Sequence, residues 1–84
     1  MNYSIKWHPK VRKFLSKLPE KISSRIVLKI KELKNDPFRY LEHYEGGDYY
    51  KLRIGDYRAL IDVDFSRRLI FVRILDHRRR VYKK

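Results

Sequence analysis

The sequence predicts a small α+β domain in which a hairpin of two helices packs on one face of an antiparallel sheet. A short alternating segment comes first, two segments with helical apolar spacing follow, and three segments of strand character end the chain. Because helices and strands are grouped rather than alternating, an α+β class is favoured over a parallel α/β fold. The length of 84 residues suits one domain, covering residues 1–84.

The amino-terminal part alternates and then becomes helical. In NYSIKW (residues 2–7) every second residue is aromatic or aliphatic, which predicts a short strand. Pro9 suits the first turn of a helix, and the apolar residues from Val11 to Leu18 recur at i, i+3, i+4 and i+7. We therefore expect a helix that begins at Pro9.

A second helix is predicted directly after the first. Pro19 ends the first helix and can open the next, and isoleucines recur at helical spacing through EKISSRIVLKIKELK (residues 20–34). Because the connection is so short, the two helices should form an antiparallel hairpin. Residues 36–48 hold a proline and two glycines, so we expect a loop there.

Three strands are then predicted, over residues 49–54, 57–64 and 69–76. Gly55 and Asp56 form a Gly-X pair between the first two, which favours a type II′ hairpin turn. That turn predicts the pairs Ile54–Tyr57, Arg53–Arg58, Leu52–Ala59 and Lys51–Leu60. If Asp64 pairs with Leu69 after the second turn, the next strand adds the pairs Ile61–Val72 and Leu60–Arg73.

Alternation sorts the side chains of these strands onto two faces of the sheet. The helix face, which the helices should cover, collects Leu52, Ile54, Tyr57, Ala59, Ile61, Val63, Ile70, Val72 and Ile74. The open face collects Lys51, Arg53, Arg58, Leu60, Asp62, Phe71, Arg73 and Leu75. A like-charge pair such as Arg53 and Arg58 destabilises a sheet by up to about 1 kcal/mol, so stability alone would not select it.

The net charge of +12 favours a polyanionic partner: nucleic acid, an acidic protein or an anionic membrane surface. There is no apolar stretch of the ~20 residues that a membrane span needs, and no signal-peptide run, so we expect a cytoplasmic protein. The chain has no cysteine, and its 3 histidines lack metal-ligand spacing. We therefore expect no disulfide, metal or other cofactor.

The carboxyl-terminal segment HRRRVYKK (residues 77–84) follows the last predicted strand. In this topology it lies beside the Gly55–Asp56 turn. It can be a disordered basic tail, or it can complete a concave cationic site that contains an aromatic hydroxyl. Arginine forks match phosphate geometry, and tyrosine can stack on a base or move a proton. For the open-face cations Lys51, Arg53 and Arg58, the alternative to an anion site is that their long side chains splay into water, or that Asp56, Asp62 and Asp64 neutralise them.

Two stretches resemble the RelE branch of the RelE/ParE superfamily of toxin–antitoxin toxins. GGDYYKLRIGDYRALIDVD is similar to that family's central hairpin, and ILDHRRRVYKK to its terminal element. The resemblance implies a ribosome-dependent endoribonuclease that cleaves mRNA in the ribosomal A site and inhibits translation. It also implies a cognate RelB-like antitoxin that neutralises the toxin, with operator DNA bound only through the antitoxin.

The resemblance assigns candidate site residues by position. Arg58 matches the family's transition-state arginine, and Arg78 the arginine of the terminal motif. Arg79 or Arg80 can take the role of Arg78, because the spacing from arginine to tyrosine is short here. Lys51 and Arg53 match the family's basic pair in the preceding strand, and Tyr82 matches its terminal tyrosine. The candidate catalytic residues are therefore Arg58, Arg78, Tyr82 and Lys51. The remaining cations are the candidate RNA-binding residues: Arg53, Arg73, Arg79, Arg80 and Lys83.

These residue types suit RNA cleavage without a metal. The ribose 2′-OH attacks the adjacent phosphate in line and leaves a 2′,3′-cyclic phosphate and a 5′-OH. Arg58 and Arg78 would neutralise the charge of the phosphorane. The general base would be Tyr82 or Lys51, with His77 as a third candidate.

Two other functions stay open from the sequence. One is a ParE-like toxin that poisons DNA gyrase without cutting RNA, and the other is a non-catalytic module that binds nucleic acid. An apolar strip on the open face can bind an acidic amphipathic antitoxin segment, or it can be a few ordinary exposed apolar side chains. That strip would consist of Leu60, Phe71 and Leu75.

Overall fold

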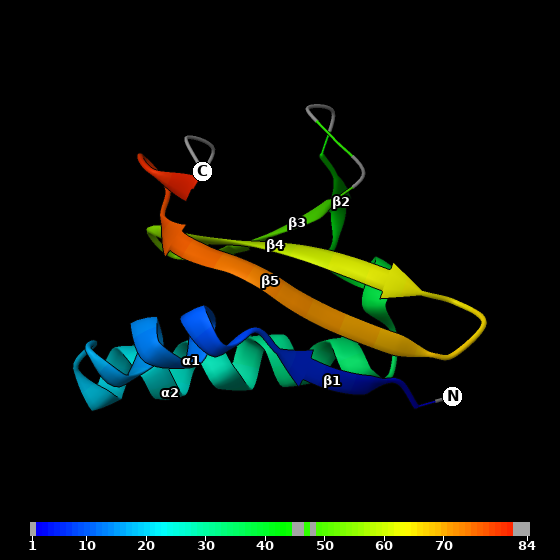
Figure 1. Ribbon diagram of the computed structural model, residues 1–84, viewed down its shortest axis with the longest axis horizontal. Helices are drawn as coiled ribbons and strands as arrows, with labels where there is room; N and C mark the ends of the chain where they lie inside the picture. The colour runs from blue at the N-terminus through cyan, green and yellow to red at the C-terminus, as the bar shows by residue number, and fades with distance from the viewer. Residues whose placement is uncertain (1, 45–46, 48, 82–84) are drawn as a thin grey trace.

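The computed structural model describes residues 2–44, 47 and 49–81 of the chain. In this part of the chain, five strands form one sheet in the order β1-β5-β4-β3-β2, and α1 and α2 lie together on one side of it (Figure 1). The elements are β1 (Ser4–Trp7), α1 (Pro9–Ser16), α2 (Glu20–Lys31), the 3₁₀ helices η1 (Glu32–Lys34) and η2 (Pro37–Arg39), β2 (Glu42–His43), β3 (Tyr50–Ile54), β4 (Tyr57–Asp64) and β5 (Leu69–His77).

The predicted α+β class is confirmed, but the sheet is mixed rather than purely antiparallel. β1 runs parallel to β5, with Ser4 opposite Leu69 and Trp7 opposite Val72. The other strand pairs are antiparallel. A four-residue alternating segment carries no information about its partner or direction, whereas in the fold β1 covers the edge of β5 that would otherwise be unpaired.

Two smaller expectations need correction. The segment predicted as helix over residues 20–34 is α-helical only to Lys31, and its last turn tightens into η1. The predicted loop over residues 36–48 contains η2 and β2. Glu42 of β2 pairs with Lys51 of β3, so this short strand extends the sheet beyond the predicted hairpin.

The β3–β4 hairpin forms as predicted from its turn residues. Gly55 has a φ of +57°, and in the described part of the chain the non-glycine residue with positive φ is Arg68, so Asp56 has negative φ. This combination agrees with a type II′ turn. The predicted register from Ile54–Tyr57 to Lys51–Leu60 is confirmed, including Arg53 directly opposite Arg58.

The register of β4 and β5 departs from the prediction halfway along. The pairs Asp64–Leu69 and Ile61–Val72 are confirmed, but Leu60 pairs with Ile74 instead of Arg73. A β-bulge adds Arg73 to β5 as an extra residue, and beyond a bulge every side chain changes face. Strict alternation cannot show such an insertion.

The bulge changes which residues form the core. Leu75, expected on the open face, is 4% exposed and belongs to the core under the helices, while Ile74 pairs with Leu60 on the open face. The helix-face core consists of Val11, Ile26, Ile30, Leu33, Leu52, Ile54, Ala59, Ile61, Ile70, Val72 and Leu75.

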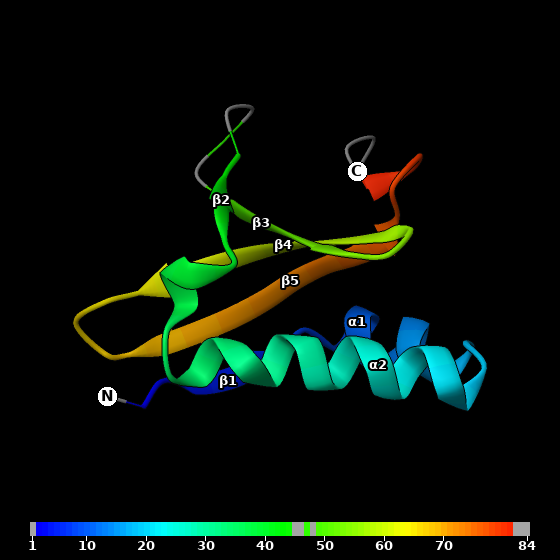
Figure 2. The ribbon, with the colours of Figure 1, turned by 180° about the vertical axis from the view of Figure 1, so that it is seen from behind.

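The open face is partly covered. Leu60 is 4% exposed and Val81 is 1% exposed, and neither belongs to the helix-face core. The turn that contains Val81 stands on the side of the sheet opposite the helices, as does β2 (Figures 1 and 2). The expected apolar strip for an antitoxin segment is therefore wrong, because Leu75 lies in the helix-face core and Leu60 is buried.

The turn between β4 and β5 is held by the carboxylate of Asp64. Its Oδ1 accepts hydrogen bonds from Ser66 Oγ at 2.9 Å and from Arg67 N at 3.0 Å. The backbone hydrogen bond from Arg67 is the main cause that lowers the pKa of Asp64 below its ordinary value, and the bond from Ser66 adds to it. The ionised carboxylate therefore stabilises this turn.

Asp64 gives a pH-dependent contribution to stability. Because its pKa is lowered on folding, this contribution is present above pH ~4, the carboxyl value in unfolded chains, and is lost as the pH falls through the folded pKa. We expect Asp64→Asn to lower the urea midpoint at pH 7 and to leave it unchanged at a pH below the folded pKa. An equal loss at both pH values would contradict this account. Asp36→Asn serves as the control.

Candidate active site

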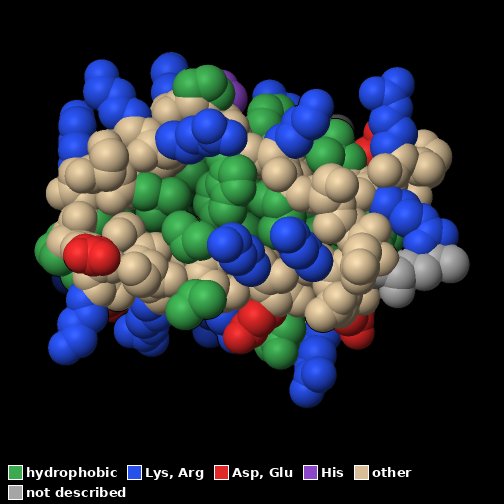
Figure 3. All heavy atoms as spheres, turned by 90° about the horizontal axis from the view of Figure 1, so that it is seen from below, with side chains coloured by type: hydrophobic (Ala, Val, Ile, Leu, Met, Phe, Trp, Pro, Cys, Tyr) green, Lys and Arg blue, Asp and Glu red, His purple; other side chains and the backbone are tan. Residues whose placement is uncertain are grey.

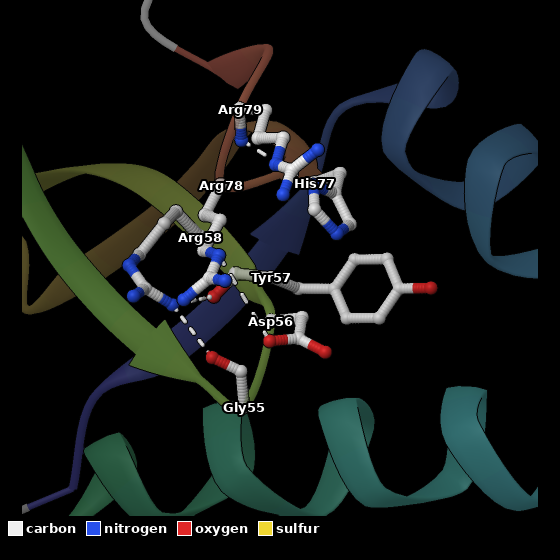
Figure 4. A network of polar contacts seen from close by, with 7 residues as sticks. All are labelled: Gly55, Asp56, Tyr57, Arg58, His77, Arg78 and Arg79. Carbon is white, nitrogen blue, oxygen red and sulfur yellow. Dashed lines mark hydrogen bonds and ion pairs between the residues drawn. The ribbon is translucent and has the colours of Figure 1, made fainter.

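The β3–β4 turn brings together the two arginines that the sequence assigns to catalysis. Arg58 follows the turn at the start of β4, and Arg78 follows the end of β5 (Figure 4). The amide of Arg78 donates a 2.8 Å hydrogen bond to Asp56 O, and its Nε lies 4.0 Å from Asp56 Oδ1. Both arginines therefore contact the same short turn, as predicted.

The guanidinium of Arg58 is oriented by backbone carbonyls. Its Nη1 donates to Gly55 O at 2.7 Å and to Tyr57 O at 2.8 Å. Both acceptors are fixed by the hairpin turn, so the side chain folds back over the turn (Figure 4). Carbonyl acceptors do not neutralise a guanidinium, so these two bonds hold Arg58 in position and leave it cationic.

Arg53 diverges from Arg58, which explains how the like-charge pair is tolerated. Arg53 lines a cavity of about 590 Å³ next to α2, together with Lys21, Arg25 and Lys29. Figure 3 shows the helix-covered side of the molecule, where lysine and arginine side chains stand around an apolar centre. Arg53 and Arg58 therefore lie in different surroundings, although they are paired across the sheet. Arg53 belongs to a basic region that continues onto α2.

Lys51 lies on the open face, two residues before Arg53. Its Nζ is 3.6 Å from Glu42 Oε2, and its side chain is 29% exposed. The partner comes from β2, which the sequence did not predict. The candidate base Lys51 is therefore held by a carboxylate from a neighbouring strand.

The third candidate base, His77, lies on the other face. It pairs with Tyr57, and the two rings are 5.8 Å apart, edge to face. Tyr57 in turn lies 6.1 Å from the ring of Phe14 in α1. Tyr57 extends away from Arg58 (Figure 4), so His77 lies with the helix-face aromatics.

Arg73 lies in the middle of the sheet, away from the turn. Its Nη1 is 2.7 Å from Asp62 Oδ2, and this hydrogen bond is the main cause that raises the pKa of Arg73 above its ordinary value. The guanidinium also lies 5.5 Å from the ring centre of Tyr49. Arg73 is thus neutralised within the sheet and is separate from the Arg58–Arg78 pair.

The remaining arginines follow β5 in a tight turn. Arg79 N donates to His77 Nδ1 at 3.3 Å, and Arg80 N donates to His77 O at 2.8 Å. Val81, which ends the described part, is 1% exposed and anchors this turn. The predicted residues Tyr82 and Lys83 lie outside the described residues.

Sequence reasoning missed two acidic residues of the site, Asp76 and Glu42. Asp76 of β5 lies directly opposite Arg58 and is 5% exposed. Asp56 forms an ion pair with Arg78, and Glu42 forms one with Lys51. The signal for Asp76 was its place immediately before the basic run, but it was assigned to neither face from the sequence, and strict alternation without the bulge would put it on the helix face. The three aspartates that were proposed to neutralise the open face lie at three different places. Asp62 forms an ion pair with Arg73, Asp56 with Arg78, and Asp64 with Arg67 in the turn between β4 and β5.

The described residues show neither a metal site nor a membrane-spanning helix. Within them, no group of three or more His, Asp or Glu side chains lies close enough to hold a metal ion. Nor does any helix in this part of the chain combine the length and apolar character needed to cross a membrane.

Solved toxin structures share this fold. The toxin–antitoxin complex RelBE2 of Mycobacterium tuberculosis matches with a TM-score of 0.77 and 25% identity, over 92% of this chain and 99% of that chain. The archaeal RelE–RelB complex of Pyrococcus horikoshii OT3 matches with a TM-score of 0.77 and 28% identity, over 93% and 97%. A mutant of the Escherichia coli toxin RelE in the free state matches with a TM-score of 0.72 and 22% identity, over 99% and 93%, and shows the fold alone. No curated protein matches the sequence.

The fold thus defines a RelE-like toxin domain. A family model described as the ParE toxin of the type II toxin–antitoxin system parDE matches residues 5–81. The chain therefore belongs to this family of type II toxins, within the RelE/ParE superfamily. The resemblance inferred from the two sequence stretches is confirmed.

Proposed function

We propose that this toxin is an endoribonuclease that cleaves mRNA in the ribosomal A site and so inhibits translation. The observation that supports it best is the meeting of Arg58 and Arg78 at the β3–β4 turn. A binding surface for nucleic acid needs only distributed cations, whereas charge stabilisation in a transition state needs donors fixed before the substrate arrives. The carbonyls that hold Arg58 provide such fixation.

The reaction uses the nucleophile that RNA carries. A ribose 2′-OH loses its proton and attacks the adjacent phosphorus, and the bond from phosphorus to the 5′-oxygen breaks. The leaving 5′-oxygen takes up a proton from water, and the products are a 2′,3′-cyclic phosphate and a 5′-OH. Arg58 and Arg78 bind the non-bridging oxygens as negative charge develops there. Lys51 or Tyr82 removes the 2′-OH proton, Lys51 after it leaves Glu42. Arg53, Arg79 and Arg80 hold the RNA backbone.

The antitoxin and the ribosome are the proposed partners. The solved neighbours from Mycobacterium tuberculosis and Pyrococcus horikoshii are complexes with a RelB antitoxin, which supports a RelB-like partner for this chain. The net charge of +12 suits both an acidic antitoxin and ribosomal RNA. Operator DNA would be contacted through the antitoxin, and such a toxin acts in the cytoplasm.

A second candidate function follows from the family model. Its description names ParE, and the ParE-like alternative is a toxin that poisons DNA gyrase without cutting RNA. The Arg58–Arg78 pair at the turn favours RNA cleavage, because poisoning a gyrase complex requires no preorganised phosphate site.

Primer extension on a translated message tests the choice. An mRNA is translated in vitro with and without the toxin, and the 5′ ends of its fragments are mapped. We expect cuts within A-site codons, which disappear when ribosomes are omitted. Intact message together with inhibited supercoiling by purified gyrase would overturn the proposal in favour of the ParE-like function.

A further inference from the structure

Asp76 is the buried acid of a largely cationic site. Its side chain is 8% exposed, although the arginine that it contacts is 68% exposed. Burying a carboxylate is costly unless charged or hydrogen-bonding groups compensate it. A residue that served only solubility or general charge balance would lie nearer the surface, as Asp56 and Asp64 do.

The β-bulge is what delivers Asp76 to this position. Counting by strict alternation from Val72 places Asp76 on the helix face. The extra residue Arg73 inverts the alternation, so that Asp76 lies directly opposite Arg58 on the open face. One inserted residue thus brings Leu75 into the core and places the acid beside the catalytic arginine.

The contacts of Asp76 hold the turn that follows β5. Its Oδ1 accepts a hydrogen bond from His77 N at 2.7 Å and lies 3.6 Å from Arg80 Nη2. The turn between these two contacts contains Arg78, whose amide binds Asp56 O at 2.8 Å. The carboxylate of Asp76 therefore contacts both ends of the segment over residues 77–80, and this segment places Arg78 at the β3–β4 turn.

We propose that Asp76 is the positioning residue of the site: its carboxylate fixes the turn over residues 77–80 and so holds Arg78 beside Arg58. This inference rests on the proposed function for its effect on cleavage, but not for its effect on the turn. Asp76 itself does not bind the substrate. As an anion it repels phosphate, so its benefit comes only through the geometry that it imposes on the arginines.

The repulsion provides a signature that a merely structural role lacks. In Asp76→Asn an acceptor oxygen remains for His77 N, but the charge that attracts Arg80 is removed. We expect the single-turnover cleavage rate on programmed ribosomes to fall about 10- to 100-fold, the range for a lost bond to a charged group. RNA affinity should stay equal or become tighter, and Asp76→Glu should recover part of the rate.

The second measurement, hydrogen exchange of the Arg78 amide, does not depend on RNA cleavage. We expect the amide of Arg78 to exchange with solvent at least about 10-fold faster in Asp76→Asn than in the parent protein, because its bond to Asp56 O opens more often. Asp64→Asn is the matched control, since it changes the same residue type at the opposite end of the sheet. It should alter neither the Arg78 exchange nor the cleavage rate.

The outcomes separate this proposal from the proposed function. If the parent protein cuts no message, RNA cleavage is refuted, while Arg78 exchange still tests Asp76. The positioning role is overturned if Arg78 exchanges equally slowly in Asp76→Asn. It is also overturned if RNA affinity and cleavage fall in parallel, which indicates general unfolding of the site.

Discussion

Replacing Arg58 with alanine is expected to lower the single-turnover rate of mRNA cleavage about 10²–10³-fold, which corresponds to ~2.7–4 kcal/mol of lost transition-state stabilisation. Arg78→Ala should have a loss of similar size. Because both guanidinium groups serve one phosphate, the double variant should be less impaired than the product of the two effects. The measurement is cleavage of a ribosome-bound message under enzyme excess, with growth arrest on expression as the cellular readout.

The control for this series is Arg67→Ala. Arg67 is equally cationic, but its side chain is 81% exposed and lies at the far turn of the sheet. It should retain full cleavage, since an exposed ion pair contributes little. Circular dichroism should show that all variants keep the parent fold, because the bonds from Arg58 to Gly55 O and Tyr57 O are local to the turn. A folded Arg58→Ala, Arg78→Ala double variant that arrests growth as well as the parent would refute the site assignment.

Ile30→Ala is expected to produce the largest loss of stability, about 2–5 kcal/mol of the free energy of unfolding. Ile30 of α2 is 0% exposed and belongs to the core between the helices and the sheet. A domain of this size is stabilised by only ~5–15 kcal/mol in total, so the variant should unfold at a clearly lower urea concentration. The fluorescence of Trp7 reports the transition.

Leu28→Ala provides the matched comparison within the same helix. Leu28 is 64% exposed, so its truncation should change the free energy of unfolding by no more than about 0.5 kcal/mol. Both variants gain some helix propensity, and the gain is slightly larger for Ile30→Ala, so propensity does not account for the expected larger loss there. Equal losses for the two variants would mean that α2 does not pack through the face that contains Ile30.

The β3–β4 hairpin shows how much of the strand pairing can be predicted from the turn residues alone. A Gly-X pair between two alternating segments specifies a type II′ turn, and a two-residue turn leaves one register. The pairing of Arg53 with Arg58 therefore follows from the turn residues alone, and the sheet contains this pair. The meeting of Arg78 with the same turn follows equally, because an antiparallel third strand must end there.

The bulge at Arg73 marks the limit of that reasoning. Its position depends on how β4 and β5 twist against each other while the helices cover one face, and neither strand alone signals an extra residue. Strict alternation therefore places Leu75 on the wrong face and conceals Asp76, the acid that faces Arg58. The partner of Lys51 was missed for a related reason, because two residues are too few for β2 to show a period.

By itself the sequence determined the class of the fold, the helical hairpin, the hairpin register and the cationic character of the site, because each depends on local periodicity, turn residues or charge. The tertiary structure decided the direction of β1, the position of the bulge and the burial of Asp76. These depend on contacts between residues distant in the chain, where packing selects among arrangements that local preferences leave nearly equal in free energy.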